Sequence, residues 1–218
     1  MSDLAVKDEH GNKLTDFDFE KKDSNMMMAY IWVGIIAIFL GGLAGLLQIM
    51  QRSGWITLPN WLTYYQLLTA HGVLLVLVFT TFFIIGYLFS GMTRTLDGKL
   101  TTGARNLGWI GFYLMTIGTA MATILILTNE GTVLYTFYTP MQASPWFYIG
   151  LALLIVGSWF SSAGMIATYT RWRKKNKGQA SPLFAYMTIV TLILWIHASL
   201  AVAVSVVFLI IPWAFGWV

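Results

Sequence analysis

The sequence has no cysteine, few charged residues and only three histidines among its 218 residues. Without cysteine, the chain forms no disulfide and offers no thiolate to a metal ion. Charged residues make up 10% of the chain, whereas a soluble domain carries about 25%, so an ordinary soluble domain is excluded. With His10, His71 and His197 as its only histidines, the chain supplies few ligands for a haem or metal centre.

Apolar residues are abundant instead, at 57% of the sequence. A helix needs about 20 mainly apolar residues to cross the hydrocarbon core of a membrane. Segments of that kind lie at roughly 26–50, 62–90, 106–128, 145–170 and 183–212. We therefore expect an all-α fold, a polytopic transmembrane helix bundle with five spans.

The prolines agree with these five segments. They all fall in connections or at span ends, where no helical hydrogen bond is lost: Pro59, Pro140, Pro145, Pro182 and Pro212. The dipeptide Ser181-Pro182 predicts that the fifth helix begins with a serine N-cap followed by a proline in the first turn.

The polar residues divide the chain into a tail at 1–25 and a transmembrane portion at 26–218. The tail is mixed in charge, with seven acids and four lysines. If the spans alternate in direction, the lysines and arginines lie on one side of the membrane, except Arg52. The positive-inside rule then places the tail in the cytoplasm and Val218 outside. Because the basic residues flank spans, the basic pI indicates membrane lipid and no nucleic acid as a partner.

Pairs of small residues predict that the spans pack closely. Gly41 and Gly45 form a G-x-x-x-G pair in the first span, and Gly118 and Ala122 form a similar pair in the third. Small residues at this spacing let the backbones of transmembrane helices approach one another. We use them only to predict a bundle, because such pairs also arise by chance in spans rich in glycine and alanine.

His71 lies in the second span, about seven residues after Tyr64 and so about 10 Å below the outer surface. A histidine inside a membrane is costly unless it has a partner or a function. Neutral imidazole is a good axial ligand for haem iron, but His71 could instead hydrogen-bond another helix. His197, near the middle of the fifth span, is interpreted as a bundle-facing histidine bonded to a hydroxyl or a backbone carbonyl. A role in proton movement or at a partner subunit is the alternative.

Two stretches resemble a known family. The run Leu68-Thr69-Ala70-His71-Gly72 resembles the low-spin haem ligand motif of subunit I of the haem-copper oxidases. The run 129–140, Asn-Glu-Gly-Thr-Val-Leu-Tyr-Thr-Phe-Tyr-Thr-Pro, is similar to the outer loop of the B-type branch, which includes the ba-type cytochrome c oxidases. Trp159, the run 171–173 and the run 211–216 also resemble that branch, whereas the 91–99 connection lacks the glycine-rich stretch of the A-type branch.

The resemblance implies part of subunit I of a terminal cytochrome c oxidase of the plasma membrane. His71 would ligate low-spin haem b and pass electrons toward a haem-copper site that reduces oxygen and drives proton translocation. Gln48 resembles a polar residue near that haem, and Tyr135 would lie near the oxygen-access side. Without the resemblance, Tyr135 and Tyr138 would be interfacial anchors.

For the acids Glu130 and Asp97, the sequence does not point to one particular role. Glu130 could orient the outer loop, assist protons near haem propionates, or be a surface carboxylate. Asp97 is expected to be a solvated loop residue with no role in proton uptake.

The chain departs from the family in length. The copper ligands, the high-spin haem ligand and the second low-spin haem ligand of subunit I all lie beyond the fifth span. We therefore expect no catalytic residue of the oxygen-reducing site in this chain, and an inactive chain on its own. Copper and high-spin haem would belong to the complete subunit. Expected partners are cytochrome c or a similar donor and other oxidase subunits, including a copper-bearing subunit II.

Two alternatives stay open. A nitric oxide reductase-like subunit would use non-haem iron in place of copper, with ligands that also lie beyond this chain. A haem-free membrane scaffold or assembly protein would lack pigment. A four-helix dihaem cytochrome b is disfavoured, because it needs two histidines on one helix and no span here has two.

Overall fold

The computed structural model describes residues 20–96, 98–136 and 140–217, which form helices and loops without a strand. The first span is α1 (Lys21–Arg52), and the second is the continuous series α2 (Tyr64–Gly72), η1 (Val73–Phe79) and α3 (Thr80–Thr95). The third is α4 (Thr102–Leu127) and the fourth is α5 (Pro145–Lys175). The fifth is α6 (Leu183–Ser205), η2 (Val206–Ile210) and α7 (Ile211–Ala214).

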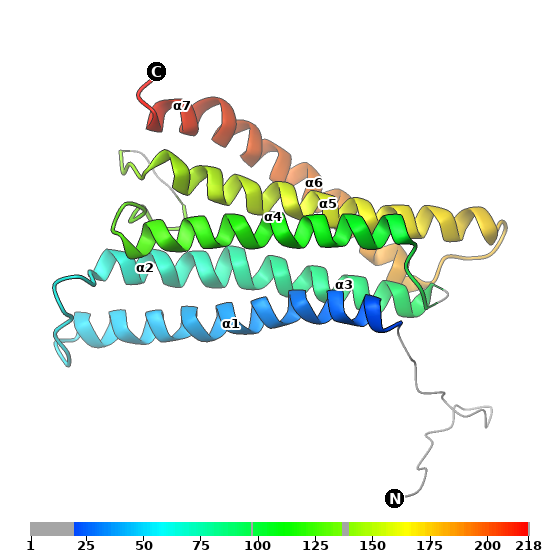
Figure 1. The fold of residues 1–218 in the computed structure, drawn as a ribbon, viewed down its shortest axis with the longest axis horizontal. Coiled ribbons are helices and arrows are strands. Elements are labelled where there is room, and N and C mark those ends of the chain that lie inside the picture. Colours follow the sequence, from blue (N-terminus) through cyan, green and yellow to red (C-terminus); the bar gives the residue numbers. More distant parts are fainter. Residues whose placement is uncertain (1–19, 97, 137–139, 218) are drawn as a thin grey trace, which may run out of the picture.

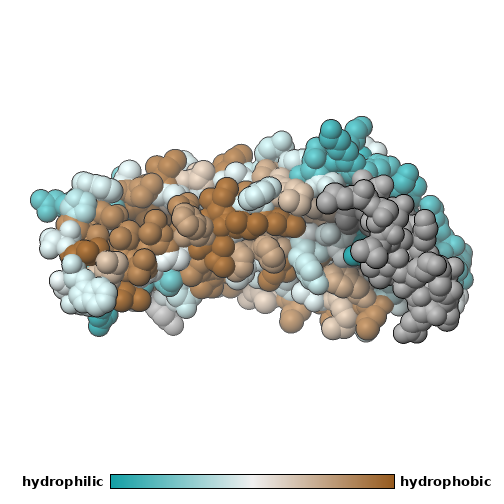
Figure 2. Space-filling view, turned by 90° about the horizontal axis from the view of Figure 1, so that it is seen from below, coloured by the Kyte–Doolittle hydropathy of each residue, from teal (hydrophilic) through white to brown (hydrophobic). Residues whose placement is uncertain are grey.

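The helices lie side by side in an elongated bundle (Figure 1). Among the described residues, five helices are long and apolar enough to cross a membrane, so the predicted fold class is confirmed. Hydrophobic side chains cover the middle of the molecule, and hydrophilic ones gather mainly at the end where α1 and α4 begin (Figure 2). The predicted orientation of the termini across the membrane stays a prediction.

The first helix begins five residues earlier than the predicted span. Asp23 is fully buried, and its carboxylate accepts hydrogen bonds from the backbone N–H of Leu100 at 3.0 Å and from Arg105 Nε at 2.5 Å. This ion pair ties the start of α1 to the start of α4. Residues 1–19 lie outside the described part of the chain, so the division into tail and transmembrane portion also stays a prediction.

The predicted serine cap of the fifth span is wrong. The N-cap of α6 is Pro182, and the helix begins at Leu183. The hydroxyl of Ser181 lies 2.7 Å from that of Tyr169 on α5 instead. A hydrogen bond to a neighbouring helix has therefore replaced the local cap.

Small residues recur every seven positions on both helices of the α4–α5 pair. A Cβ at Gly157 would lie 2.7 Å from the Gly111 carbonyl oxygen, and one at Gly164 would lie 2.8 Å from that of Ala104. Because the helices are antiparallel, the facing pairs are Ala104 with Gly164, Gly111 with Gly157, and Gly118 with Gly150. A seven-residue repeat keeps one seam of each helix facing its partner, so the backbones meet along most of their length. The predicted close packing at Gly118 is part of this seam.

Polar side chains join the remaining spans inside the bundle. Tyr30 on α1 is fully buried, and its hydroxyl lies 2.6 Å from the Gly108 carbonyl oxygen and 2.7 Å from Ser161 Oγ. Two tryptophan–serine hydrogen bonds of 2.8 Å link α5 to α6. Trp159 on α5 donates to Ser199 on α6, and Trp195 on α6 donates to Ser158 on α5. These polar side chains thus find partners on other spans, as the interior of a membrane protein favours.

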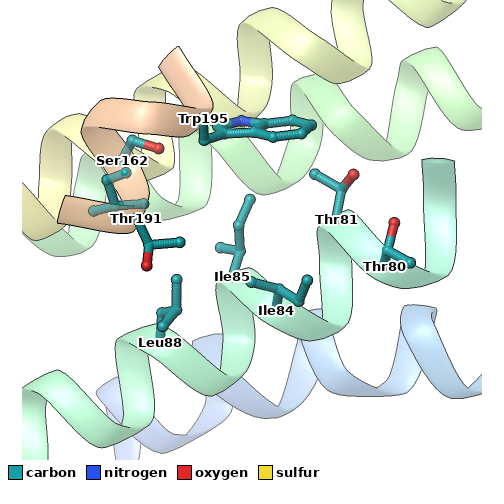
Figure 3. A pocket seen from close by; sticks show the side chains of 9 residues that line it. Thr80, Thr81, Ile84, Ile85, Leu88, Ser162, Thr191 and Trp195 are labelled. Carbon is teal, nitrogen blue, oxygen red and sulfur yellow. The ribbon is translucent and has the colours of Figure 1, made fainter. Parts of the chain in front are cut away.

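A small cavity of about 120 Å³ lies between α3, α5 and α6. Its lining is almost entirely apolar, with Ile84 and Leu88 on α3 opposite Trp195 on α6 (Figure 3). The hydroxyl groups at its edge belong to Thr80, whose side chain donates to the Val76 carbonyl of its own helix, and to Thr81, Ser162 and Thr191.

Candidate functional site

His71 lies in the last turn of α2 and faces α1. Its Nδ1 is 2.8 Å from the carbonyl oxygen of Gly41. A carbonyl only accepts, so Nδ1 carries a hydrogen, and in the neutral imidazole Nε2 then keeps its lone pair. Nε2 has no hydrogen bond to any described residue. Fixing one ring nitrogen in this way is how proteins orient a metal-ligating histidine.

Gly45 provides the space for the imidazole. A Cβ at this position would lie 2.5 Å from His71 Nδ1 and 2.6 Å from Cε1, closer than real side chains approach. One turn earlier, a Cβ at Gly41 would meet Leu75 and Leu74 of the second span. The G-x-x-x-G pair of the first span therefore packs closely as predicted, and it also forms the wall that orients His71.

The backbone of the second span changes its winding directly after the histidine. The π-helical segment η1 begins at Val73, following Gly72 without a break. Wider turns of this type occur often at functional sites. Here the change comes without a proline, since the second span contains none.

The start of α2 is attached to the end of α4. Thr63 and Gln66 form a capping box, with the Gln66 N–H donating to Thr63 Oγ1 at 3.2 Å. The same Gln66 side chain donates through Nε2 to the carbonyl oxygens of Ile126 and Leu127, at 3.0 and 2.9 Å. One buried side chain thus caps the helix that carries His71 and donates to two carbonyls in the last turn of α4.

The described part of the loop after α4 lies directly against the histidine motif. The backbone N–H of Leu134 donates to Thr69 Oγ1 at 3.0 Å, two residues before His71. A Cβ on Gly72 would lie 2.7 Å from Cδ1 of Tyr135, so the tyrosine ring packs on the glycine. Leu134 has a φ of 61°, a left-handed conformation that is uncommon for such a residue and needs tertiary support. The two runs that carry the family resemblance therefore meet in space.

Gln48 lies on the buried face of α1 that also carries Gly41 and Gly45. Its side chain is only 9% exposed, and its Oε1 has no hydrogen bond partner among the described residues. Nearly all buried polar atoms are paired in native proteins. The unpaired amide oxygen lies about one turn after Gly45 on the same face of α1.

His197 is not part of this site. Its side chain is exposed, and its Nδ1 lies 2.8 Å from the Ile193 carbonyl oxygen of its own helix. The predicted bond to a backbone carbonyl is confirmed, but the predicted bundle-facing position is wrong within the described chain. The own-helix carbonyl satisfies the ring without any contact across the bundle. Among the described residues, no group of three potential ligands for a metal ion occurs.

The other residues considered from the sequence are peripheral or lie outside the description. Glu130 is exposed, and its backbone carbonyl accepts from the Ser144 N–H at 2.8 Å. Asp97, Tyr138 and His10 lie outside the described residues. The supporting roles of Gln66 and Thr69 were not predicted, although the Thr63-x-x-Gln66 spacing is the sequence signal of a capping box.

Comparison with known proteins identifies the class. The family model for cytochrome c and quinol oxidase polypeptide I matches residues 25–218. The chain therefore belongs to this family, and it is an integral membrane protein. Haem and copper are cofactors of the family.

Two relatives give the similarity in detail. The chain is 31% identical to cytochrome c oxidase subunit 1 of Thermus thermophilus over 222 residues, covering 99% of this chain and 38% of that protein. It also matches a cryo-EM structure of a heme-copper terminal oxidase dimer with a TM-score of 0.83 and 33% identity, over 92% of this chain and 34% of that one. The chain thus spans little more than a third of the length of these relatives.

Proposed function

We propose that this chain is part of subunit I of a terminal cytochrome c oxidase and holds low-spin haem b through His71 Nε2. The observation that carries the proposal is the hydrogen bond from Nδ1 to the Gly41 carbonyl beside the space left by Gly45. Together they present a neutral imidazole with a free lone pair in a fixed orientation. A nitric oxide reductase-like subunit could use the same imidazole, but the 31% identity to a cytochrome c oxidase subunit 1 favours the oxidase. A haem-free scaffold would have no use for an imidazole held in this way.

Each neighbouring residue has a defined part in this proposal. Gly41 orients the imidazole, and the Leu134–Thr69 hydrogen bond holds the loop after α4 against the same part of α2. Gln48 is proposed to take a hydrogen bond on its free Oε1 from a group that arrives with the haem or with the rest of the subunit. Tyr135, packed on Gly72, is proposed to line the oxygen-access side.

A bound haem would supply one-electron transfer, and His71 would hold its iron from this chain. The second ligand, the copper ligands and the high-spin haem ligand are proposed to come from the rest of subunit I. In the complete complex, electrons would come from cytochrome c or a similar donor through a copper-bearing subunit II. Oxygen reduction would be coupled to proton translocation across the plasma membrane, with the N-terminus in the cytoplasm.

The test is the absorbance spectrum of the complete complex with His71→Ala or His71→Met. Low-spin haem needs two strong axial ligands, so His71→Ala should abolish the low-spin band and electron entry, and His71→Met should abolish or shift the band. The matched control is His197→Leu, which removes the other described histidine and should keep both haem bands. A normal low-spin spectrum in the His71→Ala complex would exclude His71 as a ligand.

A further inference from the structure

A cavity of about 470 Å³ lies at the polar end of the bundle, where α3 ends, α4 begins and α5 ends. It is separate from His71, which lies near the opposite end of the second span. Four cationic side chains line it, Lys99, Arg105, Arg171 and Lys175. We call it the basic cavity. Glu20 is the only acid in its lining among the described residues.

The charges in the basic cavity fall into two groups. Arg105 is neutralised by the buried Asp23 and by Glu20 at 3.1 Å, and Lys99 lies 3.3 Å from the same Glu20. Arg171 and Lys175 take part in no ion pair with a described residue. They are four residues apart on α5, so they lie on one face of its last turn and point into the same space. The cavity therefore has an excess of positive charge.

The remaining lining fits a molecule with an apolar part. Leu96, Leu100 and Trp172 form apolar walls, and Thr101 and Thr168 add hydroxyl groups. The cavity lies at the ends of spans, so in a membrane it would lie near the level where lipid headgroups meet the hydrocarbon region. Basic pockets between transmembrane helices at this level suit anionic headgroups. A freely soluble anion would need the charges but not the apolar walls.

We propose that the basic cavity binds the phosphate group of an anionic phospholipid from the leaflet that the basic loops face. Arg171 and Lys175 would contact the phosphate oxygens, and Trp172 would pack against the glycerol and upper acyl region. The bound lipid would then bridge α5 to the α3–α4 connection, which carries Lys99. This proposal stands independently of the haem site, because it uses none of the same residues.

The experiment measures lipid binding by native mass spectrometry on the delipidated complete complex, titrated with phosphatidylglycerol or with phosphatidylcholine. Wild type should bind one phosphatidylglycerol more tightly than phosphatidylcholine. The double variant Arg171→Gln with Lys175→Gln should weaken that binding about fivefold for each charge removed. The control variant, Lys174→Gln with Lys177→Gln, removes the same charge from the same helix end but outside the cavity lining, and should bind as wild type.

Two further arms separate the alternatives. The exchange Arg171→Lys with Lys175→Arg keeps both charges, so it should retain the selective binding. Excess inorganic phosphate should not displace the lipid if the apolar walls contribute, and complete displacement would assign the cavity to free phosphate instead. Equal loss in the cavity variant and its control, or no preference for phosphatidylglycerol in wild type, would overturn the proposal. The haem spectrum of each variant reports that the complex is intact.

Discussion

At the level of single residues, the sequence predicts His71 as a haem ligand but not the residues that surround it. The cost of a histidine in a span and the motif around it pointed to residue 71. Gly45 leaves space for the imidazole only because its face of α1 packs against the second span. No sequence pattern indicates which face of α1 does so. The same holds for Gln48, whose buried and unpaired Oε1 is visible only once the spans are packed.

The space at Gly45 leads to a prediction that tests the orientation of His71 without removing it. In Gly45→Ala, the new Cβ would lie 2.5 Å from Nδ1, so the imidazole must move and lose its bond to Gly41. We expect a shifted or weakened low-spin haem band in the complete complex, recorded by absorbance and electron paramagnetic resonance. Gly42→Ala is the control, because nothing lies within 4 Å of a Cβ there. An unchanged band in Gly45→Ala would mean that the imidazole is not held by this wall.

At the level of helices, the sequence predicted all five spans and missed how two of them fit together. Span length and hydropathy are local properties, so they can be read from composition. The seam between α4 and α5 was visible in part, as the Gly118 pair. The rest of the seam is formed on α5 by Gly150, Gly157 and Gly164, which are seven residues apart. This spacing indicates a helix contact only once it is matched to the small residues of the antiparallel helix α4. The start of α1 was missed because buried Asp23 is polar and its partner Arg105 is distant in sequence.

The α4–α5 seam should be sensitive to a single methyl group. In Gly157→Ala, the added Cβ would lie 2.7 Å from the Gly111 carbonyl oxygen and from Met115 Cγ. Backbone atoms cannot swing away as a side chain does, so the helices must separate. We expect a loss of about 1–3 kcal/mol in stability, the usual cost of overpacking, measured as a lower thermal transition of the purified complex.

The control for the seam is Gly103→Ala, in the first turn of α4. A Cβ there has nothing within 4 Å, and alanine is the better helix former by about 1 kcal/mol. Its transition temperature should therefore stay the same or rise. If Gly157→Ala were as stable as Gly103→Ala, the close backbone approach between α4 and α5 would be wrong.

At the level of the whole molecule, the distribution of charge has two consequences. Lysine and arginine gather at one end of the bundle, which predicts the orientation in the membrane. Four of these residues line the basic cavity, where Arg171 and Lys175 share the lining with apolar walls. The same cluster of basic residues would then set the orientation of the chain in the membrane and bind lipid. The leaflet next to the basic loops would supply the anionic headgroups.

The orientation can be tested with the cysteines that the chain lacks. Asn60→Cys lies in the exposed connection between the first two spans, and Lys177→Cys lies in the exposed connection between the last two. A membrane-impermeant maleimide added to intact cells should label position 60 and leave position 177 unlabelled until the membrane is permeabilised. Protein without either substitution is the control, because these 218 residues contain no cysteine and its labelling measures the background. Labelling of position 177 in intact cells would invert the topology and place His71 in the cytoplasmic half of the membrane, away from an external electron donor.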